Sequence, residues 1–401
     1  MMQKFKLQNG LTVVFDQKPL QSVTVQATVK VGSINETLDI SGISHFIEHM
    51  LFEGTKKRPT SKIIASEIEN VGGEINAYTS NERTCFYAKV PKKHFISALD
   101  IISDIIQNPL FNPVKISKER KIILKEINLH KDEPRFHQWV MFQKALFKDH
   151  PAKNVTYGTV KAVSSLSRKE ILNFYSKFYV PNNIILTIVG DLDNVKSLVE
   201  KAFNFKRKKL ILEDIKEETT QIKTVKKEIK KILNSYMILG YKTPKRSNNE
   251  SYIFDVIRAI LGKGQSGRLF EEIRNKRGLA YEVGAYHEPA CCYGYFAVYL
   301  NTAKSKIPLC TKLILNEFNK LKNLSKEELD DAKSFLEGKH LLDNEDSHDL
   351  ADELGFWESV GDAKLANNYI KEIMKVTKKD INKVVDKYFT ENYTLTVIQQ
   401  A

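Results

Sequence analysis

An internal repeat constrains the fold of this chain more than any other feature of its sequence. The segment SRKEI at 167–171 returns 210 residues later as TKKDI at 377–381. Two further matches lie near the same offset: NIILTI at 183–188 with NYTLTV at 392–397, and EIEN at 67–70 with EIRN at 272–275. Several matches in register indicate a duplicated unit, so the two halves of the chain should share one α+β fold.

Hydrophobic periodicity predicts the order of elements in the first half. Alternating, β-branched segments predict strands at 11–16 and 23–32, and helical spacing begins at about residue 42. The predicted elements that follow are a helix at 61–70, a strand pair within 74–90, long helices up to 147, a helix at 167–178, an apolar strand at 183–189 and a helix up to 203. The polar, aperiodic stretch 206–223 predicts a linker, which gives two domains, 1–210 and 211–401.

Composition places the chain among soluble globular proteins. Hydrophobic residues make up 42% and charged residues 28%, which argues against disorder. No apolar run reaches the length of a membrane span, and the amino-terminal segment lacks the pattern of a signal peptide. We therefore expect a cytoplasmic protein without membrane insertion. The four cysteines show no CxxC spacing and are interpreted as core or half-buried thiols.

The net charge of +13 keeps nucleic acid open as a partner. The densest basic runs are 206–209 and 223–231, and the second alternates with apolar residues. That alternation favours a solvated strand edge or linker, and no nucleic-acid motif is present, so we expect no nucleic-acid partner.

The segment HFIEHMLF at 45–52 carries the most specific chemical signal. In an α-helix, His45 and His49 lie one turn apart on the same face and form a pincer for a metal ion. Glu48 lies beside them, placed to take a proton from a water on the metal. Zinc suits such donors, because a catalytic zinc takes three protein ligands and keeps a position for water. The alternative is that these are two ordinary helix histidines. Chance produces this pattern at low frequency, which weakens the alternative but does not remove it.

A third ligand is sought in ERKIILKEI at 119–127. Glu119 and Glu126 are seven positions apart, so both carboxylates lie on one helix face. By themselves they would be interpreted as a solvated face.

Together these segments resemble the inverted zinc motif of the pitrilysin family of metallopeptidases, near its bacterial and mitochondrial processing peptidases. In that family the third ligand is a glutamate roughly 75 to 80 positions beyond the motif, in a segment similar to ERKIILKEI. Glu126 lies 77 positions beyond His49. The resemblance implies one Zn²⁺ per chain on His45, His49 and Glu126, with Glu48 as general base and Glu119 as a supporting carboxylate.

The resemblance also implies substrate-binding residues. The segment GGEINAYT, with Asn76 and Ala77, resembles the family's edge strand, to which an extended peptide can add through main-chain hydrogen bonds. Arg274 and Tyr281 resemble the family's pair in which arginine positions the substrate and tyrosine stabilises the oxyanion. Without the resemblance, Asn76 would be a turn residue, Arg274 a surface residue and Tyr281 a core aromatic.

The second half cannot repeat the metal site. At offset 210 the positions of His45, Glu48 and His49 hold Asp255, Arg258 and Ala259. One half should therefore be catalytic and the other assist. The pattern GxGxxG at 262–267 follows helical rather than strand spacing, so a dinucleotide site is not expected there.

The resemblance covers nearly the whole chain and implies a zinc-dependent endopeptidase acting on extended or unfolded peptides. It implies two homologous halves, each a mostly antiparallel sheet packed with helices. Family members with four such halves form a closed chamber, so this chain is expected to form a homodimer. Arg274 and Tyr281 would then act at the zinc site of their own chain or at that of the partner chain. The main rival is a non-catalytic scaffold subunit that binds peptides without cutting them.

Overall fold

The computed structural model describes residues 2–206, 208 and 210–401. The chain divides into two compact units, each built from three segments. Unit 1 consists of Met1–Asn128, Asn154–Asp214 and Leu342–Ala366, and unit 2 consists of Leu129–Lys153, Ile215–Leu341 and Asn367–Ala401. Each unit therefore takes a piece of the chain from the other half of the sequence, which differs from the two contiguous domains, 1–210 and 211–401, that the sequence predicts.

Unit 1 contains a six-stranded sheet in the order β1-β2-β6-β3-β5-β4. Its only parallel pair among the described strands is β2 with β6. The strands are β1 (Met2–Lys6), β2 (Thr12–Gln17), β3 (Ser22–Val29), β4 (Glu74–Thr79), β5 (Thr84–Pro91) and β6 (Ile184–Gly190). The helices are α1 (Ile43–Phe52), α2 (Ser61–Glu69), α3 (Phe95–Gln107), most of α4 (Pro113–Asp132), α6 (Val160–Ser165), α7 (Arg168–Phe178), α8 (Val195–Ala202) and α12 (Ser347–Val360).

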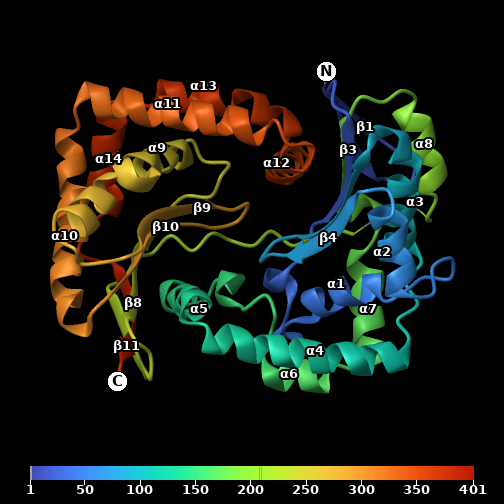
Figure 1. The fold of residues 1–401 in the computed structure, drawn as a ribbon, viewed down its shortest axis with the longest axis horizontal. Helices are drawn as coiled ribbons and strands as arrows, with labels where there is room; N and C mark the ends of the chain where they lie inside the picture. Colours follow the sequence, from blue (N-terminus) through green and yellow to red (C-terminus); the bar gives the residue numbers. More distant parts are fainter. Residues whose placement is uncertain (1, 207, 209) are drawn as a thin grey trace. The chain divides into compact units, whose positions relative to one another are not determined.

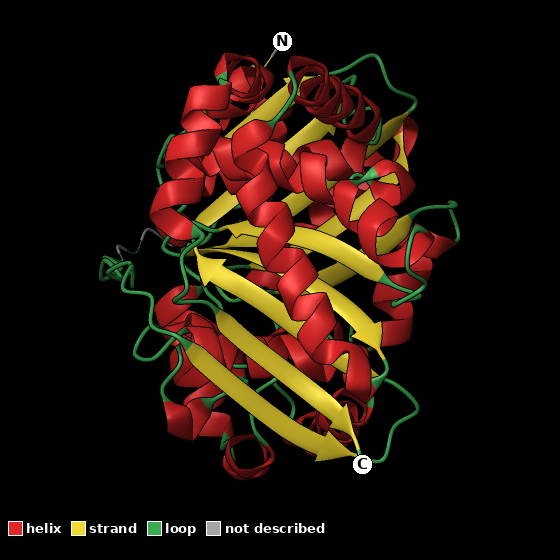
Figure 2. Cartoon of the chain, turned by 90° about the vertical axis from the view of Figure 1, so that its left-hand side faces the viewer, coloured by secondary structure: helices red, strands yellow, loops and turns green. Residues whose placement is uncertain are grey.

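Unit 2 contains a five-stranded sheet in the order β7-β11-β8-β10-β9. Strands β11 and β7 pair in parallel and end side by side near the C-terminus, which Figure 2 shows, and the other described pairs are antiparallel. The strands are β7 (Thr224–Lys230), β8 (Ser235–Lys242), β9 (Val283–Pro289), β10 (Gly294–Thr302) and β11 (Thr394–Gln400). The helices are α5 (Pro134–Leu146), α9 (Glu250–Gly262), α10 (Ile307–Lys320), most of α11 (Lys326–Asp343), α13 (Tyr369–Lys375) and α14 (Lys378–Tyr388). The predicted α+β fold with two mostly antiparallel sheets is confirmed.

The repeat in the sequence corresponds to repeated local structure. Helices α7 and α14 both have 11 residues and begin with a capping box, in which Ser167 pairs with Glu170 and Thr377 pairs with Asp380. Each of these helices leads into a seven-residue strand, β6 or β11. These two strands also make the parallel pair of their sheets. The same capping and pairing in both units supports the duplication inferred from the sequence.

The predicted elements mostly lie where periodicity places them. The strand β1 was not predicted. The linker 206–223 has no helix or strand among its described residues, and two members of the predicted basic run 206–209, Arg207 and Lys209, lie outside the described residues. The basic run 223–231 forms β7, an edge strand. The glycine-rich segment follows helix α9, as its helical spacing predicts.

Strand β3 has two different faces, which position the helices of unit 1. Val23, Val25 and Ala27 belong to the apolar core, together with residues of α1, α3 and α7. The alternate residues Thr24 and Gln26 point to the opposite face, where they contact α12. Figure 1 shows α12, from late in the sequence, beside β3. A segment of the second half of the chain thus covers the sheet that carries the candidate site.

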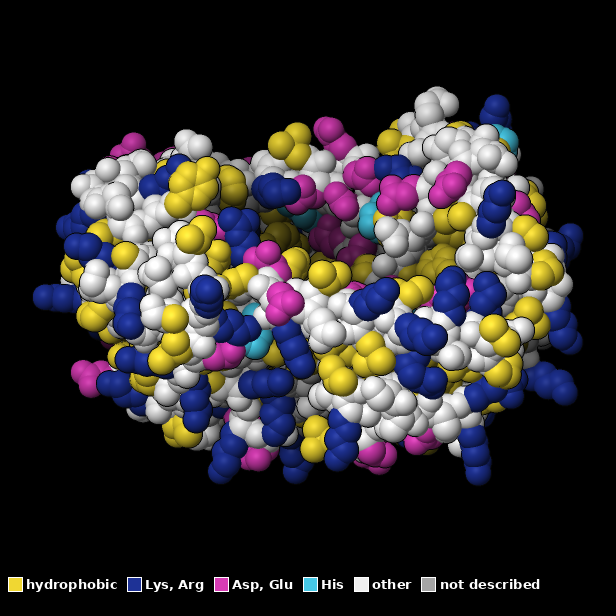
Figure 3. Space-filling view, turned by 60° about the horizontal axis from the view of Figure 1, so that its bottom comes forward, with side chains coloured by type: hydrophobic (Ala, Val, Ile, Leu, Met, Phe, Trp, Pro, Cys, Tyr) yellow, Lys and Arg dark blue, Asp and Glu magenta, His cyan; other side chains and the backbone are white. Residues whose placement is uncertain are grey.

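No helix among the described residues has the length and apolarity needed to cross a membrane. Figure 3 shows that Lys and Arg side chains are dispersed over the lower part of the displayed face, with apolar and acidic side chains between them.

Candidate metal centre

Helix α1 presents His45, Glu48 and His49 on its less buried side. The rings of His45 and His49 have their centroids 4.7 Å apart, as expected for residues one helical turn apart. The opposite side of α1 is anchored in the core by Phe46, Ile47, Met50 and Leu51. Burial of these side chains fixes the rotation of the helix and therefore the direction of both imidazoles.

The carboxylate of Glu36 fixes the beginning of α1. Its two oxygens accept hydrogen bonds from the backbone N–H groups of Gly42 (2.7 Å) and Ser44 (2.8 Å). Gly42 has a left-handed backbone with φ of 93°, and a Cβ there would lie 2.8 Å from the Cα atom of Gly158. Sequence reasoning missed Glu36, although an acidic residue shortly before a helix is a recognisable sign of N-terminal capping.

Glu36 predicts a pH dependence of stability. Burial raises the pKa of Glu36 to about 7 from 4.5, partly offset by the hydrogen bonds from Gly42 and Ser44. A raised pKa in the folded state means that the folded chain keeps a proton that the unfolded chain has released. The stabilisation from this group is complete below pH 4.5 and is lost as the pH rises through about 7.

We expect Glu36→Gln, which carries no titrating proton, to weaken this dependence. The measurement is the free energy of unfolding in urea from pH 5 to 8, for the metal-free wild type and variant. The difference between the two proteins should change with pH in favour of the variant as the pH rises. A difference that is constant across this range would contradict the role of Glu36.

Helix α4 brings two carboxylates to α1. Glu119 is buried, and its Oε2 atom lies 3.1 Å from Nδ1 of His49. Two turns further along, Glu126 lies with Oε1 at 3.7 Å from Nε2 of His45 and Oε2 at 3.7 Å from Nε2 of His49. The structure therefore brings the carboxylates of Glu119 and Glu126 next to the imidazoles of His45 and His49, as the family resemblance implies.

The spacing of His45, His49 and Glu126 suits a single metal ion. One donor atom from each residue lies within 4.8 Å of the others. For zinc, with ligand distances of about 2.0–2.1 Å, tetrahedrally placed donor atoms lie about 3.3 Å apart. The two separations of 3.7 Å between imidazole nitrogen and carboxylate oxygen are close to that value. Two imidazoles and one carboxylate are also the donor types that zinc prefers, so these residues fit the ion.

The hydrogen bond between His49 and Glu119 orients the imidazole. It places the ring proton on Nδ1 and leaves the lone pair of Nε2 facing Glu126. Burial by itself would lower the pKa of His49, but its contact with Glu119 and the charges of Glu48 and Glu126 raise it. Burial would raise the pKa of Glu119, yet its hydrogen bond with His49 and the nearby ammonium of Lys118 lower it, so this carboxylate stays ionised.

Glu48 is held by a residue that sequence reasoning did not single out. The hydroxyl of Thr79, at the end of strand β4, donates a hydrogen bond of 2.5 Å to Oε2 of Glu48. Burial raises the pKa of Glu48, and the bond from Thr79 opposes that rise. A carboxylate with a raised pKa, fixed through one oxygen, has the properties of a general base.

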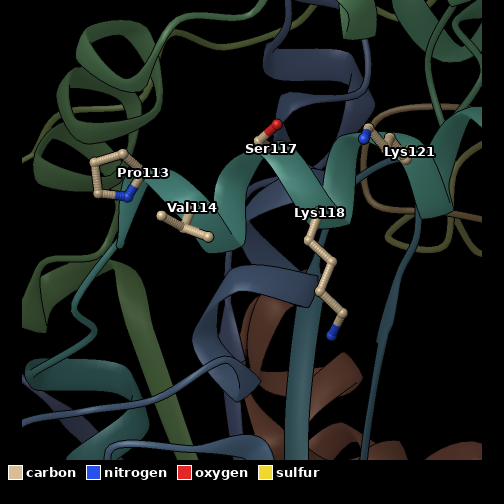
Figure 4. A pocket seen from close by; sticks show the side chains of 5 residues that line it. All are labelled: Pro113, Val114, Ser117, Lys118 and Lys121. Atoms are coloured by element: carbon tan, nitrogen blue, oxygen red, sulfur yellow. The ribbon is translucent and has the colours of Figure 1, made fainter.

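The outer side of α4 carries a shallow hollow. Figure 4 shows its lining residues, Pro113, Val114, Ser117, Lys118 and Lys121. None of the three candidate metal ligands lines it. Lys118 connects this side to the site, because its ammonium lies 3.5 Å from Oε1 of Glu119 and 3.4 Å from a carboxylate oxygen of Glu53.

Strand β4 is the edge strand of the first sheet, since among the described strands it pairs only with β5. Asn76 is exposed, and its Oδ1 atom accepts a hydrogen bond of 2.9 Å from the N–H of Ala77. A peptide adding to this edge would have to replace that acceptor. The strand therefore offers the main-chain groups that edge recognition requires, at the end that also carries Thr79.

Arg274 and Tyr281 lie together in unit 2. The guanidinium of Arg274 is 4.6 Å from the ring centroid of Tyr281 and 4.7 Å from that of Phe270. Arg274 belongs to a π-helical turn, Phe270–Asn275, and Tyr281 is 74% exposed. Unlike a core aromatic, Tyr281 presents its ring to solvent.

Two family models match consecutive parts of the chain. Residues 12–160 match the insulinase family, peptidase family M16, and residues 165–336 match the model described as the peptidase M16 inactive domain. The chain is 33% identical over 400 residues to an uncharacterized zinc protease of Rickettsia bellii, with 98% of this chain and 96% of that protein covered. It is 29% identical over 406 residues to an uncharacterized zinc protease of Bacillus subtilis, with 99% and 98% covered.

Solved structures share the fold at lower identity. A protease from Helicobacter pylori superposes with a TM-score of 0.93 at 23% identity, covering 100% of this chain and 99% of that chain. A structure described as a peptidase M16 inactive domain from Pseudomonas fluorescens gives a TM-score of 0.91 at 19% identity, covering 100% and 98%.

Sequence similarity thus places this two-unit chain in a family of peptidases. The chain belongs to the insulinase, or M16, family of peptidases, which confirms the pitrilysin-family resemblance. The closer resemblance to processing peptidases stays a prediction.

Proposed function

We propose that this protein is a zinc-dependent endopeptidase that cuts extended or unfolded peptides. The observation that carries the proposal is the convergence of two imidazoles and one carboxylate within 4.8 Å, beside a half-buried glutamate that is fixed by Thr79. The names of the relatives, which describe zinc proteases, support the same class of activity.

In this proposal His45, His49 and Glu126 hold one zinc ion. Bound zinc would polarise the scissile carbonyl and lower the pKa of water toward neutrality. Glu119 keeps the His49 ring in the tautomer that a metal ligand needs, because it accepts the Nδ1 proton at 3.1 Å.

Glu48 moves the proton during hydrolysis. Its Oε2 atom is engaged by Thr79, so Oε1 is the oxygen available to a water. Glu48 accepts a proton from the attacking water and returns it to the leaving amine, which lets one carboxyl group serve as base and then as acid. The half-buried position of Glu48 limits the access of other water molecules to its carboxylate.

The substrate binds as an added strand along β4. Main-chain pairing does not depend on side chains, so the edge beside Asn76 and Ala77 would accept many sequences. Arg274 and Tyr281 retain the roles that the family resemblance implies, positioning substrate and stabilising the oxyanion. The exposed phenol and its stacked guanidinium are suited to both roles.

Cleavage of an unstructured peptide tests the proposal against the scaffold alternative. The wild-type protein, supplied with zinc, should cut a quenched fluorescent peptide, and mass spectrometry of the products should show internal cleavage. A chelator should stop the reaction, and added zinc should restore it. Binding of the peptide without any cleavage would instead support the peptide-binding scaffold.

We predict that Glu119→Ala weakens zinc binding. Loss of the acceptor frees the His49 ring to rotate or change tautomer, and loss of such a partner raises the dissociation constant of a metal by about 10- to 100-fold. Competition with a chromogenic chelator measures the constant. The matched variant Glu119→Gln keeps an oxygen acceptor and should fall between wild type and Glu119→Ala. Equal affinities for all three proteins would remove Glu119 from the site.

A homodimer is part of the proposal, since the family resemblance implies four such units around a chamber. Light scattering should give twice the chain mass of 46.0 kDa. A mass of 46.0 kDa at working concentrations would contradict this part alone.

A further inference from the structure

Helix α12 forms a polar contact with the sheet of the candidate site. The hydroxyls of Ser347 and Thr24 lie 2.9 Å apart, and the helix approaches so closely at Gly355 that a Cβ there would lie 3.1 Å from Oγ1 of Thr28. Thr24 and Thr28 are fully buried. A buried polar contact of this kind depends on geometry, because each group must keep its partner.

Asp352 is the centre of this contact. Its Oδ1 atom accepts hydrogen bonds from the amide of Gln26 (2.9 Å) and from the hydroxyl of Tyr78. Its Oδ2 atom accepts a hydrogen bond of 2.9 Å from Arg83, with which it forms an ion pair. One carboxylate thus connects α12 to β3, to β4 and to the turn that leads into β5. The guanidinium of Arg83 also lies 5.5 Å from the ring centroid of Tyr78.

Tyr78 and Thr79 are consecutive residues of a strand, so their side chains point to opposite faces. Tyr78 binds Asp352 of α12 on one face, and Thr79 binds Glu48 of α1 on the other. The end of β4 is therefore held between the two helices. A displacement of Tyr78 would be transmitted by the backbone to Thr79 and from there to Glu48.

We propose that Asp352 is a positioning residue for hydrolysis. It touches neither Glu48 nor the candidate metal ligands, and it acts by fixing the end of β4, which orients the base and presents the peptide-binding edge. This inference rests on the proposed function. It also means that the catalytic unit is complete only with Leu342–Ala366 from the second half of the chain.

The test compares Asp352→Asn, Tyr78→Phe and their double variant with wild type. Tyr78→Phe removes only the hydroxyl that reaches Asp352. Asp349→Asn, on an exposed side of the same helix, is the matched control. Because small misplacements of a catalytic group cost up to about 100-fold in rate, we expect kcat/KM to fall by about 10- to 100-fold in each single variant. The double variant should be little worse than Asp352→Asn, and zinc affinity should be unchanged in all.

Hydrogen exchange of the β4 amides provides a readout that does not require activity. Exchange within Glu74–Thr79 should accelerate in Asp352→Asn and stay at the wild-type rate in Asp349→Asn. Unchanged exchange in Asp352→Asn, or wild-type kcat/KM in both single variants, would overturn the proposal. If the wild type cuts no peptide, the proposed function fails, and hydrogen exchange still decides whether Asp352 fixes β4.

Discussion

Glu48→Gln should lower kcat by about 10²- to 10⁴-fold, the range that general acid–base catalysis contributes. The amide has nearly the same shape and still accepts the hydrogen bond from Thr79, but it cannot take a proton from water. Since Glu48 is not among the three candidate ligands, zinc content should stay at one per chain. The measurement is single-turnover hydrolysis of the fluorescent peptide together with metal analysis.

Glu69→Gln is the control for this variant, because Glu69 is an exposed carboxylate at the end of α2. It should behave as wild type. A Glu48→Gln protein that loses its zinc would show a structural role instead of proton transfer. A variant with wild-type kcat would exclude Glu48 as the base.

His45→Ala should reduce both zinc content and peptide hydrolysis to background. Removal of one imidazole leaves two protein donors, fewer than the three that catalytic zinc sites use. The remaining carboxylates, Glu119 and Glu126, would then face His49 without the shared cation. Metal analysis after dialysis and the peptide assay measure the two effects.

A control variant at a histidine outside the site shows whether the loss of zinc is specific to His45. His94, in a short helical turn before α3, does not belong to the candidate metal groups among the described residues. His94→Ala should keep both zinc and activity. Retention of stoichiometric zinc by His45→Ala would contradict the ligand assignment. The circular dichroism spectrum of His45→Ala should match that of the wild type, which checks that the variant is folded.

The sequence predicts the spacing of the side chains on α1 well, because helical spacing is a local property. His45 and His49 are one turn apart, and Glu119 and Glu126 two turns apart, so the pairing of their faces follows from helix geometry. That the two helices meet could be inferred only from the family resemblance. Distances of 3.1 and 3.7 Å between their side chains agree with it.

Long-range contacts explain what the sequence does not predict. Tyr78 and Asp352 are 274 positions apart, and no periodicity connects them. Thr79 looks like an ordinary strand residue until β4 is packed against α1. The division into contiguous halves fails to anticipate the exchange of α5 and α12 between units for a similar reason. A repeat identifies equivalent helices, but an amphipathic helix can cover either of two similar sheets.

The zinc titration of the metal-free protein, followed by hydrolysis of the fluorescent peptide, tests the central claim most directly. The account predicts that activity is absent without metal, rises in proportion to added zinc and reaches a plateau at one equivalent per chain. Peptide hydrolysis at full rate by the metal-free protein, or a zinc-saturated protein that binds the peptide and leaves it intact, would contradict the assignment of this chain as a zinc peptidase.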